Sequence, residues 1–188
     1  MVAMKHRVCP WWLGYWLISP LRRYGQNPLD ILAPYVREGM TVLEPGPGMG
    51  FFTLELARMV GASGRVVAVD VQRKMIDKLK QRLAKAGLDS RLDARIAAAE
   101  SMGLADLRGK VDFVLAFAVV HEFPDAGRFF AEVAAASKSG ACVLVAEPKG
   151  HVKAAAFEAE LEAAAKTGLV VVERPEIRRS ITALLKKT

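Results

Sequence analysis

Cysteine and histidine are scarce in this chain, which has two cysteines and three histidines among its 188 residues. Two cysteines are too few for a disulfide framework or for a zinc site with four cysteine ligands. Cys142 lies in the apolar run 141–146, which is typical of a small core residue, and Cys9 and His6 have no further ligand types nearby. We therefore predict no metal site and a reducing, cytoplasmic setting.

Long apolar runs, repeats and low-complexity segments are also missing. The apolar stretch 8–18 is too short to span a bilayer. It contains Pro10 and Gly14, and no small-residue cleavage site follows it, which argues against a signal peptide. We predict neither export nor a transmembrane segment. With 52% hydrophobic residues the chain is expected to fold as one domain at 27–188, preceded by an aromatic segment at 1–26.

The sequence does contain a regular alternation of short apolar runs and amphipathic stretches. Strands are predicted at 41–44, 66–70, 95–98, 112–117 and 141–147, and helices at 28–36, 51–60, 75–86, around 129–133 and at 155–165. Strands that alternate with helices indicate a parallel sheet covered on both faces.

The C-terminal part breaks this alternation. The strand-like runs 169–173 and 177–185 are joined only by Arg174-Pro175-Glu176, which is too short for a crossover helix, so the two runs should pair antiparallel. The predicted fold class is α/β: a doubly wound, mostly parallel seven-stranded sheet with helices on both faces and a C-terminal antiparallel hairpin.

The stretch 42–50, VLEPGPGMG, combines an apolar strand, a carboxylate at its end and a turn with glycine at every second position. Glycine lacks a Cβ atom, so the backbone of such a turn can lie directly against a ligand. Twenty residues after Gly50, the next predicted strand ends in Asp70. A glycine-rich turn alone can serve packing only, but with this acid it favours a nucleoside ligand whose ribose hydroxyls bind the acid.

These motifs are joined by three more: FVLAF at 113–117, His121-Glu122 after it, and Glu147-Pro148 after SGA at 139–141. Together they resemble the ordered motifs of class I S-adenosylmethionine-dependent methyltransferases, over about residues 27–185. The resemblance is closest to the small single-domain enzymes of the ubiquinone and menaquinone biosynthesis group. It implies S-adenosyl-L-methionine as cofactor and methyl transfer to a small-molecule acceptor, mainly by positioning and desolvation.

The resemblance also implies which residues bind the cofactor. The glycine turn would contact its methionine portion, Glu44 its ammonium group and Asp70 its ribose. The implied cofactor-binding residues are Glu44, Gly46, Pro47, Gly48, Gly50, Asp70, Val71, Ala98, Ala99 and Phe117. At the third strand alanine stands where many relatives carry an aspartate for adenine, so either the backbone at 98–99 or Glu100 would read the adenine edge. For Glu44 the alternative is an interaction with the dipole of the helix that follows.

His121, four residues beyond the fourth predicted strand, is the candidate catalytic base or acceptor-orienting residue because its side chain titrates near neutrality. The alternative is a loop histidine hydrogen-bonded to the backbone of a neighbour. Glu122 either orients His121 or forms a surface pair. Asp125 is expected to cap the helix that contains Phe129.

The segment 9–18 places aromatic residues on every side of any helix, so it needs cover on several faces. We predict a lid over the acceptor, with Trp11 and Tyr15 as candidate acceptor contacts alongside His121. A homodimer contact and a membrane-surface anchor are the alternatives.

The net charge of +7 is concentrated after Asp70 and near the C-terminus. A basic surface attracts RNA, but such runs more often form a solvated helix face, and no nucleic-acid module is recognisable, so nucleic acid is not favoured as a partner. Two alternatives to a small-molecule enzyme stay open. One is an RNA or protein methyltransferase that uses the basic surface, and the other is a non-catalytic partner subunit that binds the cofactor.

Overall fold

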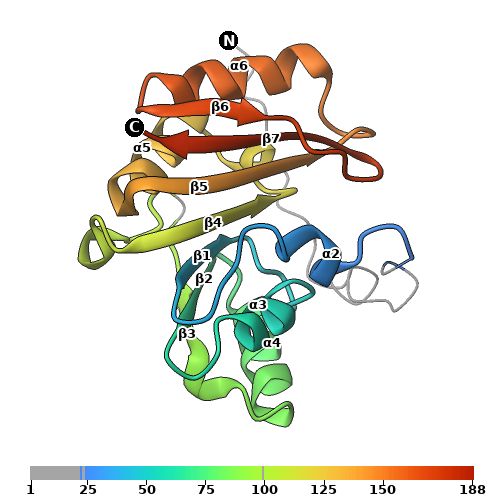
Figure 1. Ribbon diagram of the computed structural model, residues 1–188, viewed down its shortest axis with the longest axis vertical. Coiled ribbons are helices and arrows are strands. Elements are labelled where there is room, and N and C mark those ends of the chain that lie inside the picture. Colours follow the sequence, from blue (N-terminus) through green and yellow to red (C-terminus); the bar gives the residue numbers. More distant parts are fainter. Residues whose placement is uncertain (1–21, 23, 99) are drawn as a thin grey trace.

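The computed structural model describes residues 22, 24–98 and 100–188. These residues form one seven-stranded sheet together with the helices and loops that connect its strands (Figure 1). The strands are β1 (Thr41–Pro45), β2 (Arg65–Asp70), β3 (Leu92–Ile96), β4 (Val111–Phe117), β5 (Ser137–Pro148), β6 (Leu169–Glu173) and β7 (Ser180–Lys187). Their order is β3-β2-β1-β4-β5-β7-β6. The first five strands are parallel, and β7 runs antiparallel to both of its neighbours. The predicted fold class is confirmed.

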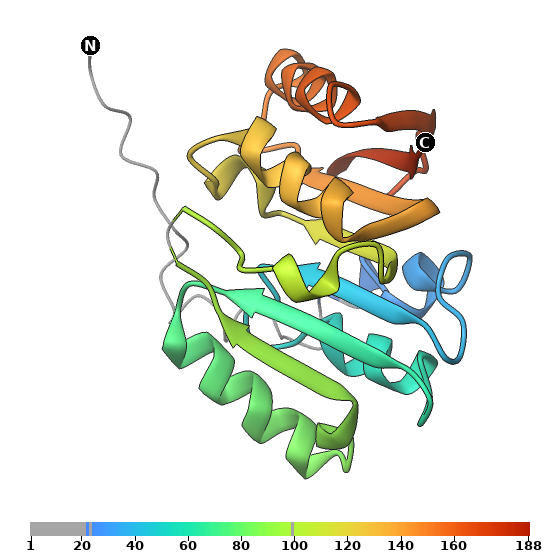
Figure 2. The ribbon, with the colours of Figure 1, turned by 90° about the vertical axis from the view of Figure 1, so that its left-hand side faces the viewer.

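Helices cover both faces of the sheet (Figures 1 and 2). They are α2 (Pro28–Leu32), α3 (Thr53–Met59), α4 (Arg73–Lys85), α5 (Ala126–Ala136) and α6 (Ala154–Ala165). One core contains Leu56 of α3 together with Val42, and the other contains Phe130 of α5 together with Leu43. Since successive strand residues point to opposite faces, each inner strand is apolar on both sides.

Local capping signals set the starts of two helices. Asn27 accepts a hydrogen bond from the backbone of Leu29 ahead of Pro28, as predicted, and Asp125 accepts one from Arg128 at the start of α5. The helix predicted at 28–36 ends at Leu32. Pro34 has no backbone N–H to donate, so one hydrogen bond of the helical series is missing, and the N–H groups of Tyr35 and Val36 both donate to the carbonyl of Leu32 in a closing turn.

The third strand, Leu92–Ile96, begins three residues before the predicted range 95–98 and ends two residues before its end. It pairs with β2 from Val66 beside Leu92 to Asp70 beside Ile96. The strand is at the edge of the sheet, and two of its five residues, Asp93 and Arg95, are charged, so the apolar pattern did not mark it. The last strand begins at Ser180, later than the predicted 177.

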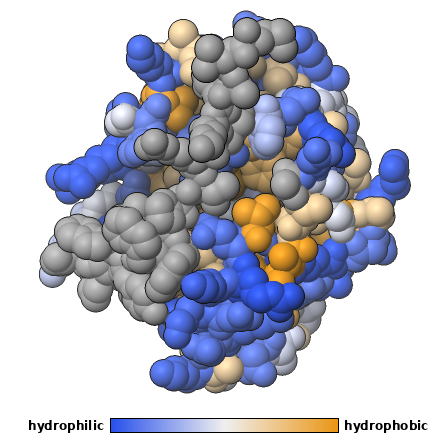
Figure 3. Space-filling view, turned by 180° about the vertical axis from the view of Figure 1, so that it is seen from behind, coloured by the Kyte–Doolittle hydropathy of each residue, from blue (hydrophilic) through white to orange (hydrophobic). Residues whose placement is uncertain are grey.

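Among the described residues, no helix is long and apolar enough to cross a bilayer. Five of the six basic residues of α4 expected to form a solvated face are exposed: Arg73, Lys74, Lys78, Lys80 and Lys85. The sixth, Arg82, is half-buried and donates a hydrogen bond to the backbone carbonyl of Met49. Seen from behind, the surface is largely hydrophilic, and hydrophobic residues gather only in small patches (Figure 3).

Candidate cofactor and acceptor site

A cavity of about 340 Å³ opens at the carboxyl ends of β1, β2 and β4. It lies where the sheet order reverses between β1 and β4, which is the usual ligand position in open α/β sheets. Its polar side chains belong to Arg22, Glu44, Asp70, Gln72 and Glu122. Its apolar wall includes Met49, Phe51, Phe52, Met102, Phe117 and Phe123. A cavity with a few polar groups in an apolar wall is typical of small-molecule sites.

The glycine turn after β1 forms one side of this cavity. Gly46, Gly48 and Gly50 have φ angles of 64°, 54° and 85°, a region that other residues rarely adopt. A Cβ atom at Gly46 would overlap Val119, and one at Gly50 would overlap Leu79, whereas one at Gly48 would meet nothing within 4 Å. Gly46 and Gly48, with Pro47 between them, line the cavity. Gly50 is not among the described residues that line it, and it serves the packing of α4.

Glu44 is 3% exposed and nevertheless lines the cavity. The hydroxyl of Thr53, at the start of α3, donates a hydrogen bond of 2.6 Å to its Oε2 atom. Burial raises the pKa of Glu44 to about 7, against the opposing effects of Thr53 and of the nearby Arg22. The carboxylate thus faces both the cavity and the beginning of α3, and it is poised to ionise beside a cation.

Arg22 was not predicted as a site residue. Its guanidinium carbon lies 4.3, 5.5 and 5.6 Å from the ring centroids of Phe51, Phe52 and Phe117. Burial lowers the pKa of Arg22 to about 10, and the charge of Glu44 opposes this decrease. The faces of these aromatic rings stabilise the guanidinium cation. Because Arg22 also interacts with the charge of Glu44, the cavity contains a positive and a negative side chain near each other.

Asp70 closes the cavity at the end of β2. Its carboxylate accepts a hydrogen bond of 2.8 Å from the backbone N–H of Gln72. Burial raises the pKa of Asp70, and the backbone groups of Gln72, Gly48 and Val71 act in the opposite direction. The N–H of Gly46 donates to the carbonyl of Val69 at 2.9 Å, which ties the glycine turn to the end of β2. Val71 lines the cavity and is 41% exposed, so its side chain offers an apolar surface to a flat ring.

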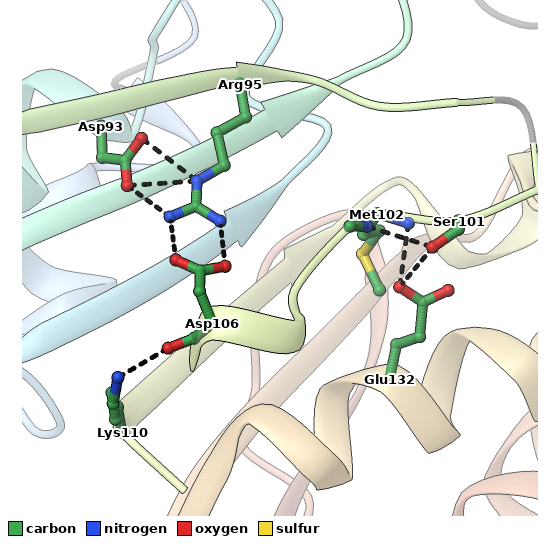
Figure 4. Close-up of polar contacts among 8 residues, drawn as sticks. Asp93, Arg95, Ser101, Met102, Asp106, Lys110 and Glu132 are labelled. Atoms are coloured by element: carbon green, nitrogen blue, oxygen red, sulfur yellow. Dashed lines mark hydrogen bonds and ion pairs between the residues drawn. The ribbon is translucent and has the colours of Figure 1, made fainter. Parts of the chain in front are cut away.

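The loop from β3 to β4 forms the next wall and is fixed at two points (Figure 4). Arg95 binds the carboxylates of Asp93 and Asp106, and Glu132 of α5 accepts hydrogen bonds from Ser101 Oγ at 3.1 Å and from the backbone of Met102 at 2.9 Å. Met102 therefore has a defined place in the cavity wall.

The adenine-reading residues expected on this loop lie differently. Ala97 lines the cavity, whereas Ala98 is exposed, pairs with Ser101 and is not among the described lining residues. The side chain of Glu100 is 83% exposed and lies 3.8 Å from Arg128. Ala99 falls outside the described residues. Ala97, together with Met102, is thus the part of this loop that lines the cavity, in place of the expected Ala98.

The loop after β4 contains a short 3₁₀ helix, η5 (Val120–Glu122), and carries the candidate base His121. Nδ1 of His121 is in direct contact with Glu147 Oε2, and this hydrogen bond raises the pKa of His121. His121 is not among the described residues that line the cavity, whereas Glu122 and Phe117 are. Glu147, rather than Glu122, therefore orients His121.

Glu147 is fully buried at the end of β5 and was not predicted as a site residue. It accepts hydrogen bonds from the backbone of Val119 at 3.2 Å and of Val120 at 2.8 Å. A signal was present, because Glu147-Pro148 repeats the pattern of Glu44-Pro45, a carboxylate and a proline at the end of an apolar run. Arg22 had no such signal, since only the tertiary fold brings it to the cavity.

The remaining site predictions are limited by the described ranges. Trp11 and Tyr15 lie outside them, so their expected contacts with an acceptor stay predictions. Within the described residues, no group of three or more metal-ligating side chains is placed to hold a metal ion.

Comparisons with known proteins agree with this geometry. A family described as "Methyltransferase domain" matches residues 36–181. The ribosomal protein L11 methyltransferase of Pelotomaculum thermopropionicum is 34% identical over 161 residues, covering 84% of this chain and 48% of the relative. The ubiquinone biosynthesis O-methyltransferase of Caulobacter vibrioides is 35% identical over 125 residues, covering 66% of this chain and 46% of the relative. The chain thus spans about half the length of these curated relatives.

A solved structure matches nearly the whole chain. The S-adenosylmethionine-dependent methyltransferase from Aquifex aeolicus superposes with a TM-score of 0.81 and 25% identity, covering 95% of this chain and all of that one. The fold, the cavity at the carboxyl ends of the strands and the family match lead to the same assignment. The chain belongs to the S-adenosylmethionine-dependent methyltransferase family.

Proposed function

We propose that this protein transfers the methyl group of S-adenosylmethionine to a small-molecule acceptor bound in the cavity described above. The cofactor supplies an electrophilic methyl group on its sulfonium sulfur. The observation that carries the proposal is the arrangement of Arg22, Glu44 and Asp70 around one cavity at the switch point of the sheet.

The donor set of the cavity fits this cofactor. A methionine group carries an ammonium and a carboxylate, and the cavity has the carboxylate of Glu44 and the guanidinium of Arg22 near each other. Asp70 offers a carboxylate for the ribose hydroxyls, and the open space beside Gly48 admits the ligand close to the backbone. The chain's own residues therefore bind and orient the cofactor and exclude water.

The rest of the cavity wall supports an acceptor that is small and largely apolar. Phe117, Phe123 and Met102 contribute apolar surface. One relative is named as a ubiquinone biosynthesis O-methyltransferase, which is consistent with such an acceptor. The free thiol of Cys142 is consistent with a cytoplasmic setting.

A protein acceptor is the second candidate, since a relative that matches 84% of this chain is named as a ribosomal protein L11 methyltransferase. The two candidates predict different labelled products. Incubating the protein with methyl-labelled cofactor and either a metabolite extract or a ribosomal protein fraction separates them. Label in a low-molecular-weight product supports the proposal, and label confined to protein contradicts it. The Glu44→Gln variant should reduce labelling at limiting cofactor concentration in either case.

A further inference from the structure

We propose that Glu160 of α6 is a positioning residue for the loop after β4. Together with His121 and Glu147 it forms a cluster of three titratable side chains, and the charge of this cluster determines how firmly the loop is held beside the cavity. None of the three is among the described residues that line the cavity. The consequence for methyl transfer rests on the proposed function, whereas the cluster itself can be tested without an acceptor.

Glu147 is the side chain that holds this loop. Its carboxylate is fully buried, and its Oε1 atom accepts hydrogen bonds from the N–H groups of Val119 at 3.2 Å and Val120 at 2.8 Å. Its Oε2 atom is in direct contact with Nδ1 of His121. Both oxygens are thus used on three consecutive residues, so the shape of the loop depends on the state of one carboxylate.

The loop forms part of the cavity wall through Ala118 and Val119. A Cβ atom at Gly46 would lie 2.5 Å from Cγ2 of Val119, so the valine side chain packs directly on the glycine turn. Ala118 has a φ of 55°, a strained conformation for a residue with a side chain. Such a conformation persists only while its surroundings hold it, so weaker contacts to Glu147 would change this part of the wall.

Glu160 adds a second carboxyl group to the pair. Its Oε2 atom is buried and has no hydrogen-bond partner in the part of the chain that the structure describes. Burial raises the pKa of Glu160 to about 7, the charge of Glu147 raises it further, and the charge of His121 opposes this increase. A buried oxygen without a partner costs less free energy on a neutral carboxyl group than on an ionised one. The surroundings of Glu160 therefore favour its protonated form.

The other charged groups nearby act on different partners. Glu122 and Glu160 both contribute to the raised pKa of His121, after the larger effect of its hydrogen bond to Glu147. The ring of the exposed His151 lies 6.4 Å from that of His121. On the elements packed against α6, the charged residues interact elsewhere: Arg128 with Glu100, Glu132 with Ser101 and Met102, Glu173 with Tyr35, and Arg174 with Glu158.

The proton of Glu160 decides whether His121 has one carboxylate partner or two. While Glu160 is protonated, the imidazolium of His121 interacts with Glu147 alone. When Glu160 ionises, a second negative charge repels Glu147 and competes for the same imidazolium. Glu147 then holds the loop less firmly, and its contacts with the cavity wall weaken.

The sign of the pH dependence follows from the two raised pKa values. The stabilisation due to neutral Glu160 is complete below 4.5 and is lost as the pH rises through about 7. The stabilisation due to charged His121 is complete below 6.5 and is lost as the pH rises through its raised pKa. Both changes loosen the loop in alkaline solution, so methyl transfer should decline there.

Nuclear magnetic resonance of the unliganded protein tests the cluster directly. Hydrogen exchange of the N–H groups of Val119 and Val120 is measured between pH 6 and pH 8.5 and corrected for the intrinsic pH dependence of exchange. We expect protection to fall by about tenfold over this range in the wild-type protein, and by less than about twofold in Glu160→Gln. The ring signal of His121, assigned by its loss in His121→Asn, should titrate at lower pH in Glu160→Gln, because one of the charges that raise its pKa is gone.

Two matched variants isolate the role of Glu160. Glu162→Gln removes one charge from the exposed face of α6 and should keep the wild-type transition. Glu44→Gln should keep it too, which separates it from the ionisation of Glu44 near the same pH. Unchanged protection in the wild-type protein, or a transition and a His121 titration that persist unaltered in Glu160→Gln, would overturn the inference. Failure to bind S-adenosylhomocysteine would instead overturn the proposed function, and the transition would still support the cluster.

Discussion

The carboxylate of Glu44 and the hydroxyl of Thr53 are joined by a buried hydrogen bond of 2.6 Å across the glycine turn. Glu44 is the next-to-last residue of β1, and Thr53 is the first residue of α3. The hydrogen bond therefore joins the two ends of the glycine turn. The same carboxylate lines the cavity. One side chain therefore connects the shape of the turn with the charge that a cofactor ammonium would meet.

Replacing Glu44 by Gln should weaken the binding of S-adenosylhomocysteine by roughly 10- to 100-fold, because a charge-assisted hydrogen bond is lost. The variant keeps the size of the side chain and an acceptor oxygen for Thr53. Calorimetry measures the change, and Glu162→Gln is the matched control on an exposed helix face. Unchanged affinity in Glu44→Gln would remove this residue from the cofactor site.

Cofactor affinity should depend on pH through Glu44. Its pKa is raised from 4.5 to about 7, so the carboxyl group becomes neutral as the pH falls below this value. We expect the affinity for S-adenosylhomocysteine to decrease by up to about tenfold per pH unit below 7 and to level off above it. Burial also raises the pKa of Glu160 to about 7, so the profile is compared with that of Glu44→Gln, which lacks only the part due to Glu44.

The raised pKa of Glu44 has the opposite effect on the stability of the free protein: an increase in pH should lower the free energy of unfolding. A carboxyl group with a raised pKa in the folded state stabilises the fold below its unfolded value of 4.5, and this contribution is lost as the pH rises through about 7. Denaturant unfolding at pH 8 should therefore show Glu44→Gln to be more stable than the wild-type protein. A less stable variant would indicate that the bond to Thr53 outweighs the burial of the charge.

Arg22 should discriminate between ligands with and without a methionine carboxylate. We expect Arg22→Ala to weaken S-adenosylhomocysteine binding about tenfold or more, through loss of a charge-assisted contact. Binding of 5′-methylthioadenosine, which lacks both the carboxylate and the ammonium, should change much less. Equal losses for the two ligands would mean that Arg22 only packs on Phe51.

The glycine turn can be tested through folding stability. Gly50→Ala places a Cβ atom against Leu79 at a φ of 85°, and we expect a loss of about 2–4 kcal/mol from overlap and backbone strain. Gly87 has a φ of 67° but open space around it, so Gly87→Ala should lose only about 1 kcal/mol. Chemical unfolding of both variants measures the difference. Similar losses would show that overlap with Leu79 does not contribute.

Features of the site that depend on local chemistry could be predicted from the sequence. Asn27 and Asp125 cap helices where expected, and the turn at Gly46 and Gly48 lies at the cavity with Asp70 beside it. The caps and the turn are determined by residues close to one another along the chain, and Asp70 is marked by its place at the end of an apolar run. The third strand was misplaced because an edge strand with alternating charges lacks a clear apolar pattern.

Features that depend on distant parts of the chain could not be predicted. Arg22 reaches the aromatic rings of the cavity only in the folded protein. Glu147 meets His121 across 26 residues, and this contact turns the candidate base away from the cavity wall. Two buried carboxylates thus have the same Glu-Pro sequence pattern, but Glu44 faces the cavity and Glu147 fixes a loop.

Calorimetric titration of the folded wild-type protein with S-adenosylmethionine, and with S-adenosylhomocysteine in parallel, is the most direct test of the cavity assignment. We expect each compound to bind as one molecule per chain, and Glu44→Gln to weaken both. The absence of binding heat at several temperatures, with a sample whose circular dichroism shows a folded α/β protein, would contradict it.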